Sequence, residues 1–208
     1  MKTLIIRDDA AAAARIILQG GLVAVPTETV YGLAANGLDE TAVEKIYAVK
    51  GRPERKPISL FVSDMDNARL FCRDIPPAAE KLAERFWPGP LTMVLKRREN
   101  VPAIVTAGGD CVGLRCPDNA FVLAMLRLAG VPVTGTSANL SGQPDAVTFA
   151  EAMAYLDGKV DGAVDGGRCP GGVPSTVVDM TLPVPRILRL GAIGAVEIEA
   201  VTGERVSL

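Results

Sequence analysis

The sequence of 208 residues contains no histidine. Histidine is the general base in Ser-His-Asp and Cys-His catalysis, so both kinds of catalysis are excluded. A metal site with histidine ligands is excluded as well. Aromatic residues make up only 4% of the chain, and any core must therefore be built from Ala, Val, Leu and Ile. The formal net charge is −2, which gives no overall field that would draw the chain onto nucleic acid. Any site for a polyanion must be a local patch.

Several common motifs are also missing. The four cysteines form no C-x-x-C pair and no zinc-site spacing, and we expect them to be reduced thiols. No signal peptide and no apolar run of membrane-spanning length is present, which predicts a cytoplasmic protein without a membrane partner. Neither G-x-x-x-x-G-K-[ST] nor G-x-G-x-x-G occurs, so a phosphate ligand would have to be bound by separate loops.

The length and the apolar content of 49% predict one α/β domain over residues 1–208, with its core at about 5–200. Strand and helix patterns interleave, but some strands follow one another directly. This favours a twisted mixed sheet flanked by helices over a strictly parallel sheet. We expect helices from 8 or 9 to 20, and at 39–49, 64–72, 76–87, 119–129, 148–156 and 193–201. We expect strands at 22–25, 58–62, 91–96, 111–115, 131–135, 160–164, 176–180 and 186–190.

Three polar segments follow apolar ones. Residues 26–33 read Pro-Thr-Glu-Thr-Val-Tyr-Gly-Leu and come directly after a predicted strand, where open α/β sheets bind ligands. Residues 50–57 carry four cations in a loop stiffened by two prolines, which suits a triphosphate. Residues 134–142 are rich in small hydroxylated residues that can bind phosphate oxygens. Taken singly, each segment is equally compatible with ordinary loop or turn chemistry.

Two arginines add to this pattern, because Arg115 and Arg189 each end a predicted apolar strand. An arginine there is costly to bury unless an anion meets it, although it could also extend to solvent.

Together these segments resemble the YrdC-type threonylcarbamoyl-AMP synthases. The resemblance rests on five motifs that occur in the order of that family: residues 26–33, the pair Lys50-x-Arg52, residues 87–92 (Trp-Pro-Gly-Pro-Leu-Thr), the pair Ser137-x-Asn139, and Ser175-Thr176. It implies a YrdC-like fold and the condensation of L-threonine, bicarbonate and ATP, with Mg²⁺, to threonylcarbamoyl-AMP and pyrophosphate. It also implies modification of adenosine 37 in tRNAs that read ANN codons, with tRNA bound directly or through a partner transferase.

The resemblance also implies roles for ten residues. The catalytic group comprises Lys50, Arg52, Ser137 and Asn139. The expected ATP-binding residues are Arg52, Lys56, Ser137 and Arg189. The expected threonine-binding residues are Thr27, Tyr31, Arg115 and Ser175. No protein side chain is predicted to bind metal, and the oligomeric state stays open.

One position departs from the family pattern, because Phe61 stands where many relatives carry a histidine near threonine. We interpret this change as tuning of the amino-acid pocket. The main alternative is a non-catalytic RNA-binding paralogue of the same fold, but such proteins typically lose the two signature pairs that this sequence keeps. A second alternative is the carbamoyl-transfer domain of hydrogenase maturation factors, which lies in longer chains with zinc-binding segments.

Overall fold

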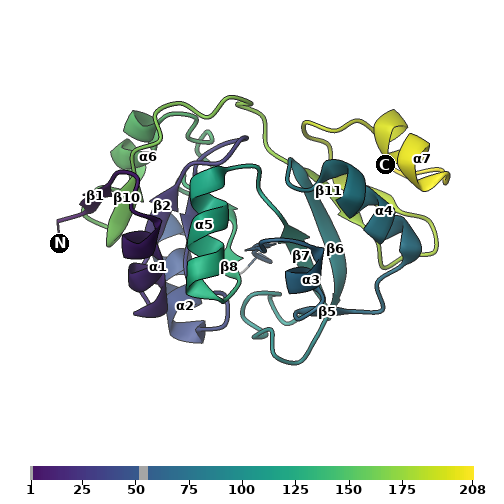
Figure 1. Ribbon diagram of the computed structural model, residues 1–208, viewed down its shortest axis with the longest axis horizontal. Helices are drawn as coiled ribbons and strands as arrows, with labels where there is room; N and C mark the ends of the chain where they lie inside the picture. Colours follow the sequence, from purple (N-terminus) through teal and green to yellow (C-terminus); the bar gives the residue numbers. More distant parts are fainter. Residues whose placement is uncertain (1, 52–55) are drawn as a thin grey trace.

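The computed structural model describes residues 2–51 and 56–208 (Figure 1). Its helices are α1 (Ala10–Leu18), α2 (Glu40–Lys50), α3 (Met65–Ala68), α4 (Pro77–Phe86), α5 (Ala120–Ala129), α6 (Phe149–Leu156) and α7 (Ala195–Thr202). Its strands are β1 (Leu4–Ile6), β2 (Val23–Val25), β3 (Gly32–Ala34), β4 (Leu60–Phe61), β5 (Cys72–Arg73), β6 (Leu91–Arg97), β7 (Cys111–Arg115), β8 (Val133–Thr134), β9 (Thr136–Ser137), β10 (Gly162–Val164), β11 (Thr176–Asp179) and β12 (Arg186–Arg189).

The strands form two mixed sheets. The first has the order β1-β10-β2-β3-β9, with parallel pairing up to β2 and antiparallel pairing from β2 onward. The second has the order β12-β11-β6-β7-β4-β8, in which β11 with β6 and β4 with β7 are the parallel pairs. The expectation of a mixed α/β fold is therefore confirmed, and its strands are divided between two sheets.

The chain passes from one sheet to the other at Gly135. The single strand expected at 131–135 is instead two short strands, with β8 in the second sheet and β9 in the first. The backbone N–H of Gly135 donates to the Ser59 carbonyl at 2.6 Å, so the crossing lies directly against the chain before β4. A Cβ at Gly135 would lie 2.4 Å from the Phe61 ring, and this close approach requires glycine.

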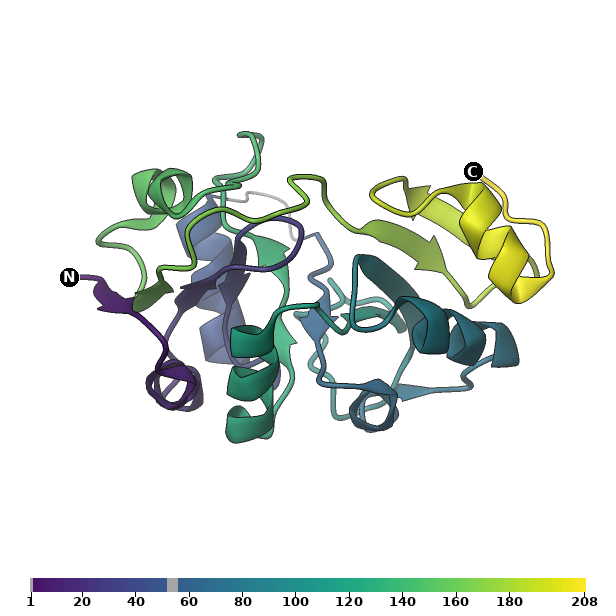
Figure 2. The same ribbon diagram turned by 45° about the horizontal axis from the view of Figure 1, so that its top comes forward.

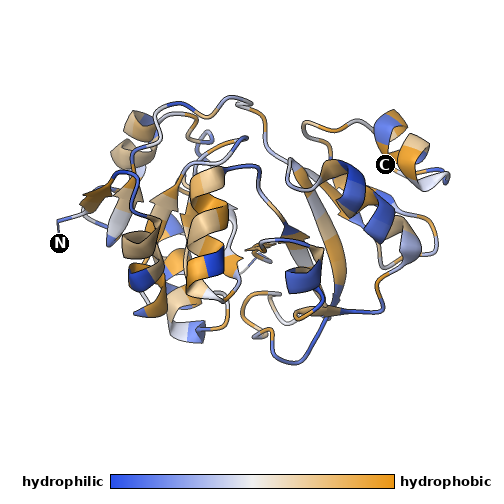
Figure 3. Ribbon diagram, viewed as in Figure 1, coloured by the Kyte–Doolittle hydropathy of each residue, from blue (hydrophilic) through white to orange (hydrophobic). Residues whose placement is uncertain are grey.

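Local signals explain most helix boundaries. Asp9, Asp39 and Asn119 accept backbone N–H groups at the first turns of α1, α2 and α5. Gly51 ends α2 in the left-handed conformation, at φ +59°. Helices α1 and α5 pack side by side over one half of the molecule, and α4 packs on α7 over the other (Figure 1). Hydrophilic residues gather on α3 and α4, whereas the strands are largely hydrophobic (Figure 3).

The expected helix at 64–72 is wrong. The helix covers only Met65–Ala68, and Cys72 lies in β5, where it pairs with Arg97. The pairing with β6 ends the helix, because a strand partner from a distant part of the sequence overrides local propensity. Four short strands, β1, β3, β5 and β9, were not predicted. Within the described residues, no helix is both long and apolar enough to span a bilayer.

Candidate active site

A cavity of about 720 Å³ opens between the two sheets. Its floor is one face of the second sheet, where alternate residues of β6 and β7 point to the same side. The floor residues are Ser59 and Phe61, Thr92 and Val94, Cys111, Gly113 and Arg115, Ser175 and Val177, and the consecutive pair Leu188 and Arg189. Its opposite wall comes from Thr27 and residues 29–32, which lead into β3, and from residues 135–137, which include the edge strand β9 of the first sheet. Residues from both ends of the chain therefore share one cavity.

Arg115 ends β7 and is almost completely buried, with 6% of its side chain exposed. Its Nη2 donates to Glu28 Oε1 at 2.7 Å and to Thr29 Oγ1 at 2.9 Å, and its Nε donates to the Gly89 carbonyl at 3.2 Å. Its guanidinium carbon also lies 5.6 Å from the centre of the Phe61 ring. Such fixed contacts hold the guanidinium in one orientation, which suits a residue that binds a planar anion such as a carboxylate.

The Trp-Pro-Gly-Pro-Leu-Thr motif supports this arginine. The Trp87 ring N–H donates to the Leu91 carbonyl at 2.8 Å, and the Gly89 N–H donates to the Cys116 carbonyl at 2.8 Å. These bonds shape a tight turn, and a Cβ at Gly89 would lie 2.4 Å from the Phe86 carbonyl oxygen. The turn therefore presents the Gly89 carbonyl to Arg115, and the motif acts through backbone geometry.

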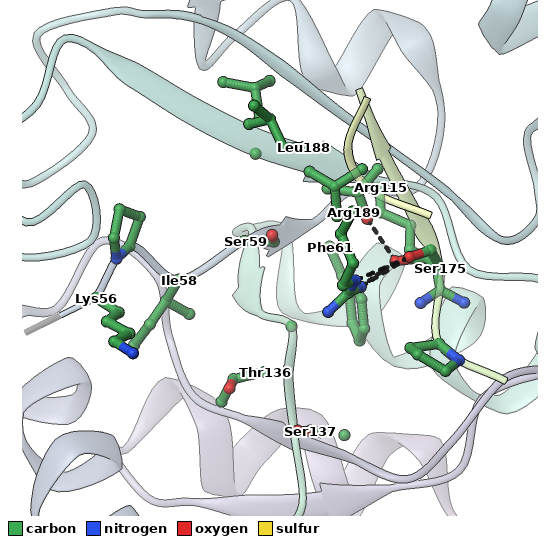
Figure 4. A pocket seen from close by; sticks show the side chains of 18 of the residues that line it. Lys56, Ile58, Ser59, Phe61, Arg115, Thr136, Ser137, Ser175, Leu188 and Arg189 are labelled. Atoms are coloured by element: carbon green, nitrogen blue, oxygen red, sulfur yellow. Dashed lines mark hydrogen bonds between the residues drawn. The ribbon is translucent and has the colours of Figure 1, made fainter. Parts of the chain in front are cut away.

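Ser175 and Arg189 lie beside Arg115 in the cavity, and Figure 4 shows the three side chains grouped together. Arg189 donates from Nε and Nη2 to the Ser175 carbonyl, at 3.2 and 2.8 Å, and from Nη2 to Ser175 Oγ at 3.1 Å. The Oγ atoms of Ser175 and Thr92 lie 2.9 Å apart. This chain of contacts joins β12, β11 and β6 at one end of the cavity.

In the segment 26–33, the predicted Thr27 and Tyr31 line the cavity but use their hydroxyls within the protein. Thr27 Oγ1 donates to the Val30 carbonyl at 2.7 Å and accepts from the N–H groups of Thr29 and Val30. The Tyr31 hydroxyl accepts from Gly166 N–H and donates to the Gly167 carbonyl, both at 3.1 Å. Burial raises the pKa of Tyr31 to about 12, partly offset by the Gly166 hydrogen bond.

The loop after β9 places the predicted Ser-Asn pair. Ser137 lines the cavity, and its Oγ donates to Asn139 Oδ1 at 2.6 Å. Asn139 also donates to the Gln143 carbonyl and lies behind the cavity wall. Lys50 is buried under the same loop, where its ammonium donates to the carbonyls of Ser137 and Asn139. Lys50 and Asn139 therefore lie behind Ser137 and hold its loop in place.

The remaining predicted residues belong to the basic loop. Lys56 lines the cavity at the end opposite to Arg189 (Figure 4), and the Tyr47 hydroxyl anchors its carbonyl at 2.7 Å. Arg52 lies outside the described residues. The structure thus gathers seven of the ten predicted residues around one cavity: Thr27, Tyr31, Lys56, Arg115, Ser137, Ser175 and Arg189.

The sequence reasoning missed Glu28, Thr92 and Asp145. Glu28 is the partner of Arg115 across the two sheets, and only the fold brings them together. Thr92 faces the cavity because it alternates with the buried Leu91 and Met93, a signal that was readable from the strand period. Asp145 follows the Ser-Asn loop in the sequence and lines the cavity, but it belongs to none of the five motifs.

Comparison with known proteins places this site in a family. The sequence model of the family Sua5_yciO_yrdC, described as Telomere recombination, matches residues 15–191. The chain belongs to the Sua5/YciO/YrdC family. Two curated Sua5/YciO/YrdC relatives are named threonylcarbamoyl-AMP synthase. The relative from Pyrococcus abyssi is 44% identical over 92% of this chain and 56% of its own length, and the one from Bacillus subtilis is 43% identical over 93% and 56%.

The fold agrees with that of a solved Sua5/YciO/YrdC structure, P. abyssi Sua5 complexed with L-threonine. The TM-score is 0.94 at 40% identity, and the match covers 99% of this chain and 62% of the P. abyssi chain. The chain spans about half the length of the curated relatives it matches. The expectation, drawn from the five motifs, that the chain belongs to this family is thus confirmed.

Proposed function

We propose that this cavity is the active site of a threonylcarbamoyl-AMP synthase, which condenses L-threonine, bicarbonate and ATP to threonylcarbamoyl-AMP and pyrophosphate. The observation that carries the proposal is the gathering of seven predicted residues, from six separate segments of the chain, around one cavity. The names of the curated relatives and the threonine complex of P. abyssi Sua5 support it.

The cavity has two ends with different chemistry. The end with Arg115, Ser175 and Arg189 offers a fixed guanidinium and hydroxyls, and we assign it to the threonine carboxylate and to its junction with the nucleotide. The end with Lys56 and the wall at Ser137 offer a cation and a hydroxyl, which suit the phosphates. The carbamate of threonine would lie between the two ends.

The chemical step needs electrostatic stabilisation more than proton transfer. A carbamate oxygen attacks the α-phosphorus, a new O–P bond forms, and the bond to the leaving pyrophosphate breaks. Negative charge accumulates on the phosphate oxygens, where Lys56 and Arg189 can stabilise it. The Ser137 hydroxyl can also donate there once it turns away from Asn139 Oδ1. Once the carbamate exists, no side-chain base is required, in agreement with a chain that lacks histidine.

Magnesium enters with ATP in this proposal and would neutralise phosphate charge. In the part of the chain that the structure describes, no three His, Cys, Asp or Glu side chains are close enough to form a metal site. In this proposal the phosphates and water would hold the ion, and the protein would bind the complex through Lys56 and Ser137.

The proposal extends to the fate of the product. We infer that the adenylate serves the modification of adenosine 37 in tRNAs that read ANN codons, in the cytoplasm and through a partner transferase that meets the tRNA. The RNA-binding alternative has less support, because the Ser-Asn pair and Lys50 form one bonded loop beside the cavity.

The decisive experiment measures pyrophosphate release from Mg²⁺-ATP by the purified chain. Release should require both L-threonine and bicarbonate, and Arg52→Ala should reduce it far more than Arg127→Ala, a change at an exposed position of α5. If the chain released no pyrophosphate but bound RNA, it would be a non-catalytic RNA-binding paralogue and not a synthase.

A further inference from the structure

A second cavity lies between α3 and α4, on the half of the molecule that also carries α7 (Figure 1). Its volume is about 330 Å³, and among the described residues it shares no lining residue with the cavity between the two sheets. The two cavities are nevertheless neighbours, because the consecutive residues Arg115 and Cys116 line one each. We call this second cavity the α3–α4 pocket. It is a separate place for a ligand, close to the candidate active site.

The less exposed part of the α3–α4 pocket is apolar and aromatic. Ala83 and Trp87, four residues apart on one face of the α4 segment, line it together with Met65 of α3. Ala83 is buried, and Trp87 and Met65 are half-buried. The Trp87 ring N–H donates to the Leu91 carbonyl at 2.8 Å, so the only hydrogen-bond donor of the ring is already used. What the ring offers a ligand is therefore its aromatic surface.

The charged residues of the α3–α4 pocket leave an excess of negative charge. Three carboxylates line it, those of Asp64, Glu80 and Glu84, against one guanidinium, that of Arg69. Arg69 is already shared between Glu80, at 2.7 Å, and Asp66 outside the pocket. Within residues 2–51 and 56–208, no ion pair engages Asp64 or Glu84, and both residues are exposed. The pocket thus has an acidic rim around an aromatic and apolar base.

This combination matches the chemistry of an arginine side chain. A planar guanidinium stacks on an indole ring and donates to carboxylates beside it, and its methylene stem covers apolar groups such as Met65. The surroundings favour an arginine that belongs to a protein. Leu70 directly follows Arg69 and is 57% exposed, and Pro88 at the pocket is exposed as well. A small molecule inside the pocket would leave this flanking apolar surface in water, whereas a protein segment would cover it.

We propose that the α3–α4 pocket is a docking site for an arginine side chain presented by a partner protein. This inference goes beyond the proposed function and does not depend on it, because the occupant leaves the cavity between the two sheets open. The acidic rim argues against a nucleic acid as the partner, since the rim would repel its phosphates.

The test uses the fluorescence of Trp87, the only tryptophan in the sequence, which reports directly on this pocket. The probe is a capped leucine-arginine-leucine tripeptide, and its control carries citrulline, which keeps the shape of arginine without its charge. The arginine peptide should change the emission saturably. The citrulline peptide should bind with a Kd about 10-fold higher or more, since hydrogen bonds to a charged group are lost. Agmatine, a guanidinium without a peptide, should bind more weakly than the arginine peptide.

Glu84→Lys should raise the Kd of the arginine peptide at least about 5-fold, because attraction at the rim becomes repulsion. The matched control is Glu40→Lys, which makes the same charge change at an exposed position of α2 and should bind like the wild type. The inference is overturned if the arginine peptide gives no saturable change, if the citrulline peptide binds equally well, or if Glu84→Lys binds like the wild type. Agmatine binding as tightly as the peptide would also overturn it, by assigning the pocket to a small organic cation.

Discussion

At the scale of single residues, the pair formed by Arg115 and Glu28 links the two sheets. Both side chains are largely buried, at 6% and 14% exposure, and their atoms approach to 2.7 Å. Glu28 Oε2 is buried and has no hydrogen-bond partner among the described residues. Burying the two charges costs desolvation free energy, and their mutual contact is the one ionic contact of the pair among the described residues that offsets it, beside the bonds from Arg115 to Thr29 and Gly89.

Glu28→Ala should accordingly lower the free energy of unfolding by about 3 to 5 kcal/mol, because it leaves the Arg115 charge buried without compensation. Glu28→Gln keeps the shape and a hydrogen-bond acceptor and should cost less. Urea denaturation of the two variants measures the difference. Equal stability of Glu28→Ala and wild type would show that the pair does not hold the sheets together.

Tyr31 gives a residue-scale prediction about pH. Its pKa is about 12 in the folded protein, against an ordinary 10.0, so the unfolded chain releases this proton first. Between these two values the unfolded state binds fewer protons than the native state, and stability should fall as the pH rises from 10 to 12. Tyrosinate absorbance of the native protein should show one of its three tyrosines ionising last. Simultaneous ionisation of all three near pH 10 in folded protein would contradict the burial of Tyr31.

At the scale of elements, the loop after β9 depends on the last turn of α2. Lys50 follows Val43, Ile46 and Tyr47 on the buried face of that helix, at spacings of seven, four and three residues. Its ammonium holds the carbonyls of Ser137 and Asn139, whereas Lys56 is exposed and faces the cavity. Two lysines of one basic segment thus have different tasks.

Replacing each of these lysines by methionine should separate the two tasks. Lys50→Met leaves the loop carbonyls without their buried donor and should lower both the melting temperature and pyrophosphate release. Lys56→Met should weaken Mg²⁺-ATP binding and leave the melting temperature near that of the wild type. Lys81→Met, on the exposed side of α4, is the control and should change neither property. Loss of stability in Lys56→Met alone would reverse the assignment.

The same elements show what the sequence can predict. Helices with clear caps, such as those begun by Asp39 and Asn119, were located to within one or two residues, because the signals are local. The two-residue strands β8 and β9 were not separated, since their partners lie far away in the sequence and the crossing at Gly135 depends on the Phe61 ring. In the site, motif order identified residues that meet in the cavity. The helical period of α2 predicts that the Lys50 side chain lies on the buried face. The pairing of Glu28 with Arg115 could not be predicted in this way, because the two residues meet only in the assembled fold.

At the scale of the whole molecule, the cavity is shared by both sheets, and the segment 165–175 crosses between the two halves (Figure 2). The N–H groups of Gly171 and Gly172 donate to the carbonyls of Glu28 and Thr29, which ties this crossing to the 26–33 segment. A ligand in the cavity therefore contacts both halves and should stabilise them together.

Cysteine labelling tests this arrangement. Cys111 is partly exposed and lines the cavity, whereas Cys72, Cys116 and Cys169 are buried. Burial also raises the pKa of the Cys72 and Cys116 thiols, to about 11 and 12, which keeps them protonated and unreactive. Iodoacetamide should label Cys111 first, and Mg²⁺-ATP with L-threonine should slow that labelling; mass spectrometry identifies the site. Labelling at the same rate with and without ligands would place them outside this cavity.

The position of Arg189 in the cavity has a consequence for synthesis of the protein. Thr27 and Tyr31 leave the ribosome early, but Arg189 and the strand that carries it emerge among the last parts of the domain. A nascent chain can therefore build most of the first sheet while one wall of the cavity is still missing. Substrate binding should begin only when β12 has joined β11, so a chain released before that point would be folded in part and inactive.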